Sequence, residues 1–278
     1  MILFTGNGKS GSWKIRGLQL GSAVGGVISP QCTNLQQNNV NLVVMVKKEV
    51  PGVVQECRKN NIPWVWDVVD GWPQPSGNQW DKDTAVKWLK EAIARLQPTA
   101  MVFPTKAMAE DAEFKGRWLV LPHHAWGKYE KVKHHPTNVV VGYEGGPHYI
   151  QPWVKQITEE CNRRKWTFLN NGDMQKCHIG LALRGFSGHP ARNWKSNVKL
   201  ANIQGLGIPA ICSNEAGYRE YMSGVEFFVE DAHQLSHAFS QLEDFERRRI
   251  IGHMMHERKI TLASIALRYR LWLDQLSS

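Results

Sequence analysis

The chain has 278 residues, of which 34 are Lys or Arg and 25 are Asp or Glu, so its formal net charge is +9. Apolar residues make up 42% of the sequence, which excludes a disordered chain, and no stretch approaches the ~20 apolar residues that a membrane helix needs. The five cysteines are widely spaced and form no Cys-x-x-Cys pair, which argues against a disulfide framework and a structural zinc site. We therefore expect a globular protein of a reducing cytoplasm, without a membrane segment, for which phosphates, polyanions or acidic surfaces are plausible partners.

The first half of the chain alternates short apolar runs with segments of helical periodicity. The N-terminal run has no basic leader or cleavage site, so it predicts a strand rather than a signal peptide. Strands are expected at residues 2–5, 42–46, 64–69, 100–103 and 118–121. Helices are expected at 12–24, 50–60, 83–96 and 105–113, with Asp83 as the cap of the third.

Residues 122–137 interrupt this alternation, because they hold two prolines and four histidines with little apolar pattern, and they predict a linker. In the second half, strands are expected at 139–141, 166–169, 179–183, 209–212 and 227–229. Helices are expected at 150–165, 196–206 and 215–222, after Asp231, and across 243–273. Strands that alternate with helices form parallel sheets, so the two series predict an α/β fold of two Rossmann-like, doubly wound domains facing a cleft. An active site is expected at the carboxyl ends of the strands.

The loop after the first strand, residues 6–12, is rich in glycine but lacks the spacing of a P-loop, because Leu3 stands where the motif requires its first glycine. The loop either lines a substrate or is a plain tight turn. Several tryptophans also fall in expected loops, among them Trp72, and these are candidates for stacking on a sugar or a base.

The segment between Asp173 and Glu215 contains no acidic residue but five basic ones, which are Lys176, Arg184, Arg192, Lys195 and Lys199. Several of them fall at the end of an expected strand and in the first turn of the helix that follows. Cations at a helix N-terminus oppose the helix dipole, so a bound anion such as a phosphate would compensate them. The alternative is a basic surface without a ligand.

Acidic residues and histidines supply candidates for proton transfer. Asp67 and Asp70 flank the end of an expected strand, where one of them could be a general base, and the alternative is that both are solvated loop acids. His123 and His124 could bind an acceptor or a phosphate, but adjacent histidines point apart on an extended chain, so no metal site is expected. The carboxylates of Glu215 and Glu220 could bind a ribose diol or cap a helix.

The stretches 196–211 and 215–220 resemble the donor-binding segment of GT-B glycosyltransferases, and most closely that of family-4-like enzymes with a Lys-Leu-x-x-Ala-x-x-x-Gly-x-Pro-x-Ile pattern. Residues 120–124 are similar to the exit of the first domain in these enzymes, and residues 141–146 to the start of the second. The order of the domains matches over nearly the whole chain. The resemblance thus implies the GT-B architecture, with an acceptor-binding domain at 1–130, a nucleotide-sugar-binding domain at 131–250, and a C-terminal helix at 251–278 that packs back on the first domain.

The resemblance also implies roles for individual residues. Lys199, with Arg184 or Lys195, would hold the donor diphosphate and stabilise the departing phosphate, and Glu220 would hold the ribose. The donor would be UDP-glucose or a similar nucleotide-sugar, and no metal would be required. The implied donor-binding residues are Gly145, Gly146, Arg184, Lys195, Lys199, Asn202 and Glu220. The implied acceptor-binding residues are Gly8, Lys9, Ser10, Trp13, Arg16 and Trp72.

The sequence departs from the family pattern at one point. Family-4 enzymes have a Glu-x7-Glu pair, and the two corresponding positions here hold Trp194 and Asn202. The stereochemistry of the family therefore does not carry over. An inverting reaction would need a base, for which Asp67, Asp70 and His123 are the candidates, whereas a retaining reaction would need no strong base.

The acceptor is the second open point. Compact, basic GT-B proteins resemble phage-type transferases that glucosylate hydroxymethylated pyrimidines, such as hydroxymethylcytosine, in DNA. Residues 1–139 hold 17 basic and 11 acidic residues, a net charge of +6, against +3 for the remainder, and a basic acceptor domain fits double-stranded DNA. We expect a cytoplasmic monomer, in the cytoplasm of the host cell if the protein is phage-encoded. The alternatives are a small-molecule, glycan or protein acceptor, or a non-catalytic nucleotide- or nucleic-acid-binding module.

Overall fold

The computed structural model describes residues 1–30, 34–70 and 76–277. The chain divides into two units with their own internal contacts. Unit 1 comprises Met1–His123, Gly188–Ser196 and Thr261–Ser278, and unit 2 comprises His124–Ser187 and Asn197–Ile260. These units differ from the expected domain limits mainly because the short segment 188–196, in the middle of the second half, belongs to unit 1.

Unit 1 is built on a six-stranded sheet in the order β2-β1-β3-β4-β5-β6, in which every pairing is parallel. The strands are β1 (Ile2–Gly6), β2 (Val27–Ile28), β3 (Leu42–Val46), β4 (Trp64–Asp67), β5 (Ala100–Phe103) and β6 (Arg117–Val120). All residues of β3, β4 and β5 are buried, as expected for central strands of a parallel sheet that is covered on both faces. The two-residue edge strand β2 was not predicted, because it is too short to show a pattern.

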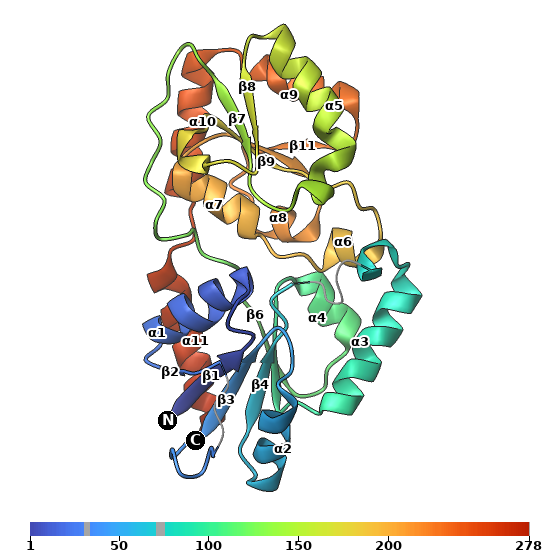
Figure 1. Ribbon diagram of the computed structural model, residues 1–278, viewed down its shortest axis with the longest axis vertical. Helices are drawn as coiled ribbons and strands as arrows, with labels where there is room; N and C mark the ends of the chain where they lie inside the picture. The colour runs from blue at the N-terminus through green and yellow to red at the C-terminus, as the bar shows by residue number, and fades with distance from the viewer. Residues whose placement is uncertain (31–33, 71–75, 278) are drawn as a thin grey trace. The chain divides into compact units, whose positions relative to one another are not determined.

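Helices cover both faces of this sheet (Figure 1). Side chains alternate between the faces, so Leu3 packs into the core beneath α2 and α3, whereas the ring of Phe4 lies 6.2 Å from that of Tyr269 in α11. The helical segments of unit 1 are a π-helix at Trp13–Leu20, α1 (Gly21–Ala23), α2 (Pro51–Lys59), a 3₁₀ turn at Ser76–Gln79, α3 (Lys82–Leu96), α4 (Lys106–Ala112), α6 (His189–Asn193) and α11 (Leu262–Ser277).

The caps of these helices correct one expectation and explain another. The cap of α3 is Asp81 and not Asp83, since an Asp81 carboxylate oxygen accepts a hydrogen bond of 2.8 Å from the Thr84 amide. The region expected to be helical across 243–273 consists of two helices, because a new cap lies inside it. The Thr261 hydroxyl accepts the Ser264 amide at 3.2 Å, directly before α11 begins.

Unit 2 contains a five-stranded parallel sheet in the order β11-β10-β9-β7-β8. The strands are β7 (Val140–Tyr143), β8 (Thr167–Asn170), β9 (Ile179–Ala182), β10 (Ala210–Ser213) and β11 (Phe227–Val229). The helices are α5 (Pro147–Arg163), α7 (Val198–Leu206), α8 (Ala216–Glu220), α9 (Ala232–Gln241) and α10 (Phe245–Glu257). Asp231 caps α9 as predicted, through a 2.8 Å hydrogen bond to the Gln234 amide.

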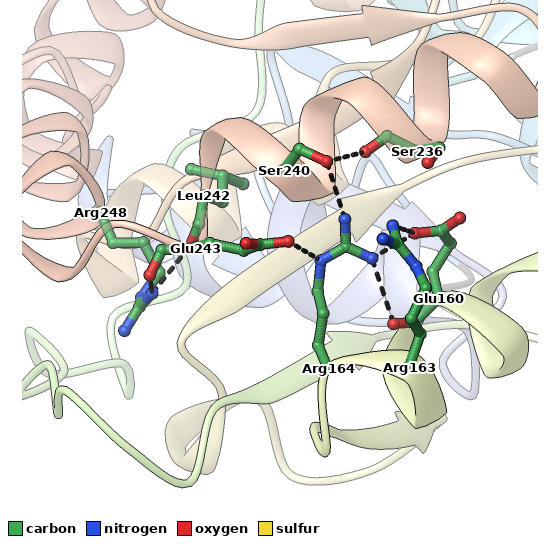
Figure 2. A network of polar contacts seen from close by, with 8 residues as sticks. All are labelled: Glu160, Arg163, Arg164, Ser236, Ser240, Leu242, Glu243 and Arg248. Carbon is green, nitrogen blue, oxygen red and sulfur yellow. Dashed lines mark hydrogen bonds and ion pairs between the residues drawn. The ribbon is translucent and has the colours of Figure 1, made fainter.

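Two guanidinium groups fix the corner between α5, α9 and α10 (Figure 2). Arg164 pairs with Glu160 and Glu243, the latter at 2.7 Å, and donates to the Ser240 hydroxyl at 2.9 Å. Arg248 is 1% exposed and donates to the carbonyls of Leu242 and Glu243 at 2.7 and 2.8 Å, where α9 has ended. These cations satisfy the carbonyls at the end of a helix, so their role is structural.

Candidate functional site

In unit 2, polar side chains gather at the carboxyl edge of the sheet. The parallel register places Tyr143 of β7 beside Leu181 of β9, and Ala182 of β9 beside Cys212 of β10. The loops that follow these three strands therefore leave the sheet at one edge, where ligands bind in folds of this type. The first turn of α7 supplies Lys199 to the same cluster.

Arg184, directly after β9, is the best-anchored cation of the cluster. Its guanidinium forms an ion pair with Glu215, and the two side chains are only 8% and 4% exposed. The Arg184 amide donates to the Ser213 hydroxyl at 2.8 Å, and the guanidinium carbon lies 5.6 Å from the centre of the Tyr218 ring. Backbone and side chain are both fixed, so this guanidinium is oriented before any ligand arrives.

Lys199 lies in the first turn of α7 and has a different environment. Its ammonium donates to the backbone carbonyl of Glu144 and lies 4.3 Å from the centre of the Tyr143 ring. Burial and, to a smaller extent, the nearby positive charge of Arg184 lower the pKa of Lys199 to about 7, while Glu144 opposes the shift. The two groups that the Lys199 amine contacts directly, a carbonyl and an aromatic ring, are both neutral.

Gly145 makes the position of Lys199 possible. Its φ of +138° lies in a region that L side chains rarely adopt, and a Cβ at this position would collide with the Lys199 ammonium. Gly146 follows at the N-cap of α5, and its carbonyl accepts a hydrogen bond of 3.4 Å from the Tyr143 hydroxyl. The glycine-rich loop therefore shapes the site through its backbone.

Glu144 was not predicted as a site residue. Its carboxylate accepts hydrogen bonds from the Tyr129 hydroxyl at 3.1 Å and from the Asn202 amide at 2.9 Å. The Asn202 carbonyl oxygen in turn accepts the Trp126 amide at 3.1 Å. Asn202 thus positions Glu144, and the signal in the sequence was the single acid inside the loop that follows β7.

The two remaining donor residues that the resemblance implies are Glu220 and Lys195. Glu220 is exposed at the last position of α8, whereas Glu215, just before that helix, reaches Arg184. Lys195 is buried within the segment that belongs to unit 1. Of the implied donor residues, unit 2 brings together Gly145, Gly146, Arg184, Lys199 and Asn202.

The candidate acids of unit 1 lie at the carboxyl end of β4. Asp67 is 1% exposed, with one carboxylate oxygen 3.8 Å from Nε of Arg16 and the other accepting the Val69 amide at 3.2 Å. Burial raises the pKa of Asp67, and Arg16 opposes that rise. Asp70 is partly exposed and pairs with Lys47 at 2.8 Å, and His123 is 2% exposed. Of these three side chains, only that of Asp70 reaches solvent to an appreciable extent.

The expected acceptor residues also divide into buried and exposed ones. Trp13 and Arg16 are buried, and Arg16 also donates to the carbonyl of Leu121, so neither side chain offers a surface to an acceptor. Gly8 and Lys9 are exposed and Ser10 is partly exposed, in the loop that follows β1. Trp72 lies outside the described residues.

No group of three or more His, Cys, Asp or Glu side chains within residues 1–30, 34–70 and 76–277 is arranged to hold a metal ion. Across the same ranges, no helix is both long enough and apolar enough to cross a membrane.

Comparison with solved structures places the fold of the chain among GT-B proteins. HepE from Anabaena in complex with UDP-glucose matches with a TM-score of 0.69 and 12% identity, covering 99% of each chain. HepE in complex with UDP and glucose gives a TM-score of 0.67 at 12% identity, with 98% of this chain and 99% of that chain covered. The spinosyn forosaminyltransferase SpnP gives 0.52 at 11%, with 99% and 98% covered. At these identities the likeness establishes the fold, which is that of GT-B glycosyltransferases.

By sequence, no protein-family model and no curated protein matches the chain.

Proposed function

We propose that the chain is a glycosyltransferase that moves a sugar from a nucleotide-sugar donor to an acceptor hydroxyl, with the donor held by unit 2. The observation that carries this proposal is the pair of cations Arg184 and Lys199 at the carboxyl edge of the second sheet. HepE, which has the same fold over 99% of this chain, was solved with UDP-glucose.

The two cations suit a diphosphate for different reasons. A guanidinium offers a planar fork of donors that matches phosphate oxygens, and Arg184 is already oriented by Glu215. An ammonium acts as a point charge, and Lys199 can exchange its carbonyl contact for a phosphate oxygen. When the bond to the sugar breaks, negative charge grows on the leaving diphosphate, and fixed cations stabilise that charge. In this proposal the protein's own cations do this work without a metal.

For the acceptor we propose a hydroxymethylated pyrimidine in double-stranded DNA, which the charge of unit 1 favours. Unit 1 contains 18 Lys and Arg against 11 Asp and Glu, so it carries +7 of the total charge of +9. Phosphate contacts dominate the affinity of proteins for DNA, and a base that reacts must leave the stack. If the reaction inverts, Asp70 is the base that solvent can reach, while Asp67 and His123 would have to become accessible.

The test is a set of nucleotide-sugars, led by UDP-glucose, incubated with the protein and three acceptors. These are DNA containing 5-hydroxymethylcytosine, DNA containing 5-hydroxymethyluracil, and unmodified DNA. We expect release of the nucleoside diphosphate and a gain of one sugar mass on a modified nucleoside, with both lost in Lys199→Ala.

The outcomes separate the alternatives. Donor hydrolysis without any gain of mass on DNA would keep the glycosyltransferase and reject the DNA acceptor. Binding of the donor without release of a nucleoside diphosphate would favour a non-catalytic module. If no nucleotide-sugar binds, the proposal fails.

A further inference from the structure

The partners of Lys199 set it apart from the other cation of the site. Among the described residues, no carboxylate forms an ion pair with the Lys199 ammonium, which contacts a carbonyl and an aromatic ring. The two acids of this cluster are already engaged. Glu215 pairs with Arg184, and the carboxylate of Glu144 accepts hydrogen bonds from Tyr129 and Asn202.

This environment favours the neutral amine. A half-buried ammonium without an ion pair loses part of its hydration, and a guanidinium nearby adds repulsion. Both effects act on Lys199, whose pKa falls to about 7. A diphosphate bound between Arg184 and Lys199 would reverse the balance, because its negative charges favour the protonated form.

We propose that Lys199 takes up a proton when a nucleotide-sugar binds, so that the affinity for the donor decreases as the pH rises above neutral. This inference rests on the proposed function, because it requires a diphosphate at this site. A ligand that raises the pKa of a group binds with uptake of a proton at any pH between the free and the bound value.

The direction of the pH dependence follows from that rule. Below pH 7 the free protein already carries the ammonium, and the affinity changes little. Above pH 7 a proton must be acquired on binding, so the affinity falls by up to about tenfold for each pH unit, until the pH exceeds the raised pKa of the complex.

Other titratable or charged groups lie on the elements around Lys199. Burial raises the pKa of Tyr143 to about 12 and also raises that of Tyr218, so both phenols stay neutral over this range. Histidine is the residue type that changes charge near neutral pH, and His148 in the first turn of α5 is close enough to Gly146 to need a control. The groups around the site are Tyr143, Glu144, His148, Tyr149, Arg184, Glu215 and Tyr218.

The experiment is calorimetry of UDP-glucose binding at pH 8.0 in two phosphate-free buffers of different ionisation enthalpy, HEPES and Tris. UDP-glucose is the probe because its diphosphate is esterified at both ends and does not titrate near neutral pH. The difference in heat between the buffers counts the protons taken up. We expect nearly one proton for the wild type and for His148→Gln, and close to none for Lys199→Arg, whose guanidinium stays charged.

A second measurement keeps the test decisive if Lys199→Arg binds too weakly for calorimetry. The protein is labelled with ¹³C-lysine, the Cε signal of Lys199 is assigned by its loss in Lys199→Arg, and the signal is titrated with and without UDP-glucose. We expect a midpoint near pH 7 in the free protein and a midpoint about two or more pH units higher in the complex. Binding without proton uptake, equal uptake in wild type and Lys199→Arg, or a midpoint that UDP-glucose does not move would overturn the inference and leave the proposed function standing. Failure of UDP-glucose to bind the wild type would overturn both.

Discussion

Each of the two units has a buried arginine–carboxylate pair near the carboxyl edge of its sheet, and the two pairs differ in what surrounds them. In unit 1, Arg16 and Asp67 are 0% and 1% exposed, their nearest charged atoms lie 3.8 Å apart, and Arg16 also donates to the carbonyl of Leu121. In unit 2, Arg184 and Glu215 are almost as buried, but Lys199 adds a second cation, with which no carboxylate of the described residues forms an ion pair.

The difference separates a structural pair from a ligand site. A buried pair whose charges cancel gives no reason to expect a ligand, and it holds its elements together. A site with a cation left over favours an anion from outside. Burial alone does not distinguish the two pairs, because both are almost fully buried. They differ in the additional cation, Lys199, that lies near Arg184.

The largest effect is expected for Arg184→Met. We expect the rate of donor hydrolysis or transfer to fall about 10³-fold, since the oriented guanidinium at the diphosphate is lost. We also expect the free energy of unfolding to fall by about 3 kcal/mol, because Glu215 is left buried without a partner. Rates of UDP release and urea denaturation measure the two effects.

The double variant Arg184→Met/Glu215→Leu separates these two consequences. Stability should largely return, because no buried charge remains, while the activity stays lost. Arg192→Gln is the matched control, since Arg192 belongs to the same acid-free segment but is exposed. If the double variant recovers activity, Arg184 has no role at the donor and is structural like Arg16.

Arg16→Met should give the opposite profile in unit 1. Removal of one partner strands Asp67, so we expect the free energy of unfolding to fall by about 3 kcal/mol in urea denaturation. Binding of UDP-glucose per folded molecule should stay within about twofold of the wild type, as expected for a site carried by other residues. A selective loss of donor binding with unchanged stability would show that this pair is functional after all.

Lys199→Ala should produce a loss of about 10²-fold in the rate of UDP release with little change in stability. Unlike Arg184, Lys199 forms no ion pair with a carboxylate in the described part of the chain, so its removal would leave none of those acids unpaired. Lys176→Ala is the matched control, because Lys176 lies in the same acid-free segment and its side chain is 74% exposed. An unchanged rate in Lys199→Ala would remove Lys199 from the donor site.

Much of the fold could be predicted because each strand of the two sheets is a short apolar run between loops. The runs at 42–46, 100–103 and 227–229 match or nearly match the observed strands. Short elements such as β2 and α6 were missed, because too few residues carry their pattern. The attachment of 188–196 to unit 1 was also missed. It depends on long-range contacts, such as the 2.8 Å hydrogen bond from Trp194 to Asp111, which no local pattern shows.

The candidate site was only partly predictable for a related reason. The gap in acidic residues pointed to Arg184 and Lys199, because charge is visible in a sequence. Which carboxylate pairs with which cation depends on how the side chains pack, and the sequence alone does not show this. Glu215 pairs with Arg184, although Glu220 was the expected site residue. Asp67 forms an ion pair with Arg16, although both were candidates for contact with a substrate.

The smallest effect is expected for Gly145→Ala. This variant tests whether donor binding depends on the position of the Lys199 ammonium in the free protein. An alanine here must adopt an unfavourable φ, and its Cβ displaces the Lys199 ammonium from the carbonyl of Glu144. We expect a cost of about 1–3 kcal/mol in unfolding and a KM for the donor about tenfold higher, with a smaller change in kcat. Gly52→Ala in α2 is the control, since a Cβ there meets nothing within 4 Å. If both kinetic constants stay at the wild-type values while stability falls, the contact between Lys199 and the loop is part of folding only. Donor binding would then not depend on where the Lys199 ammonium lies in the free protein. The two arginine pairs would differ only in the additional positive charge beside Arg184.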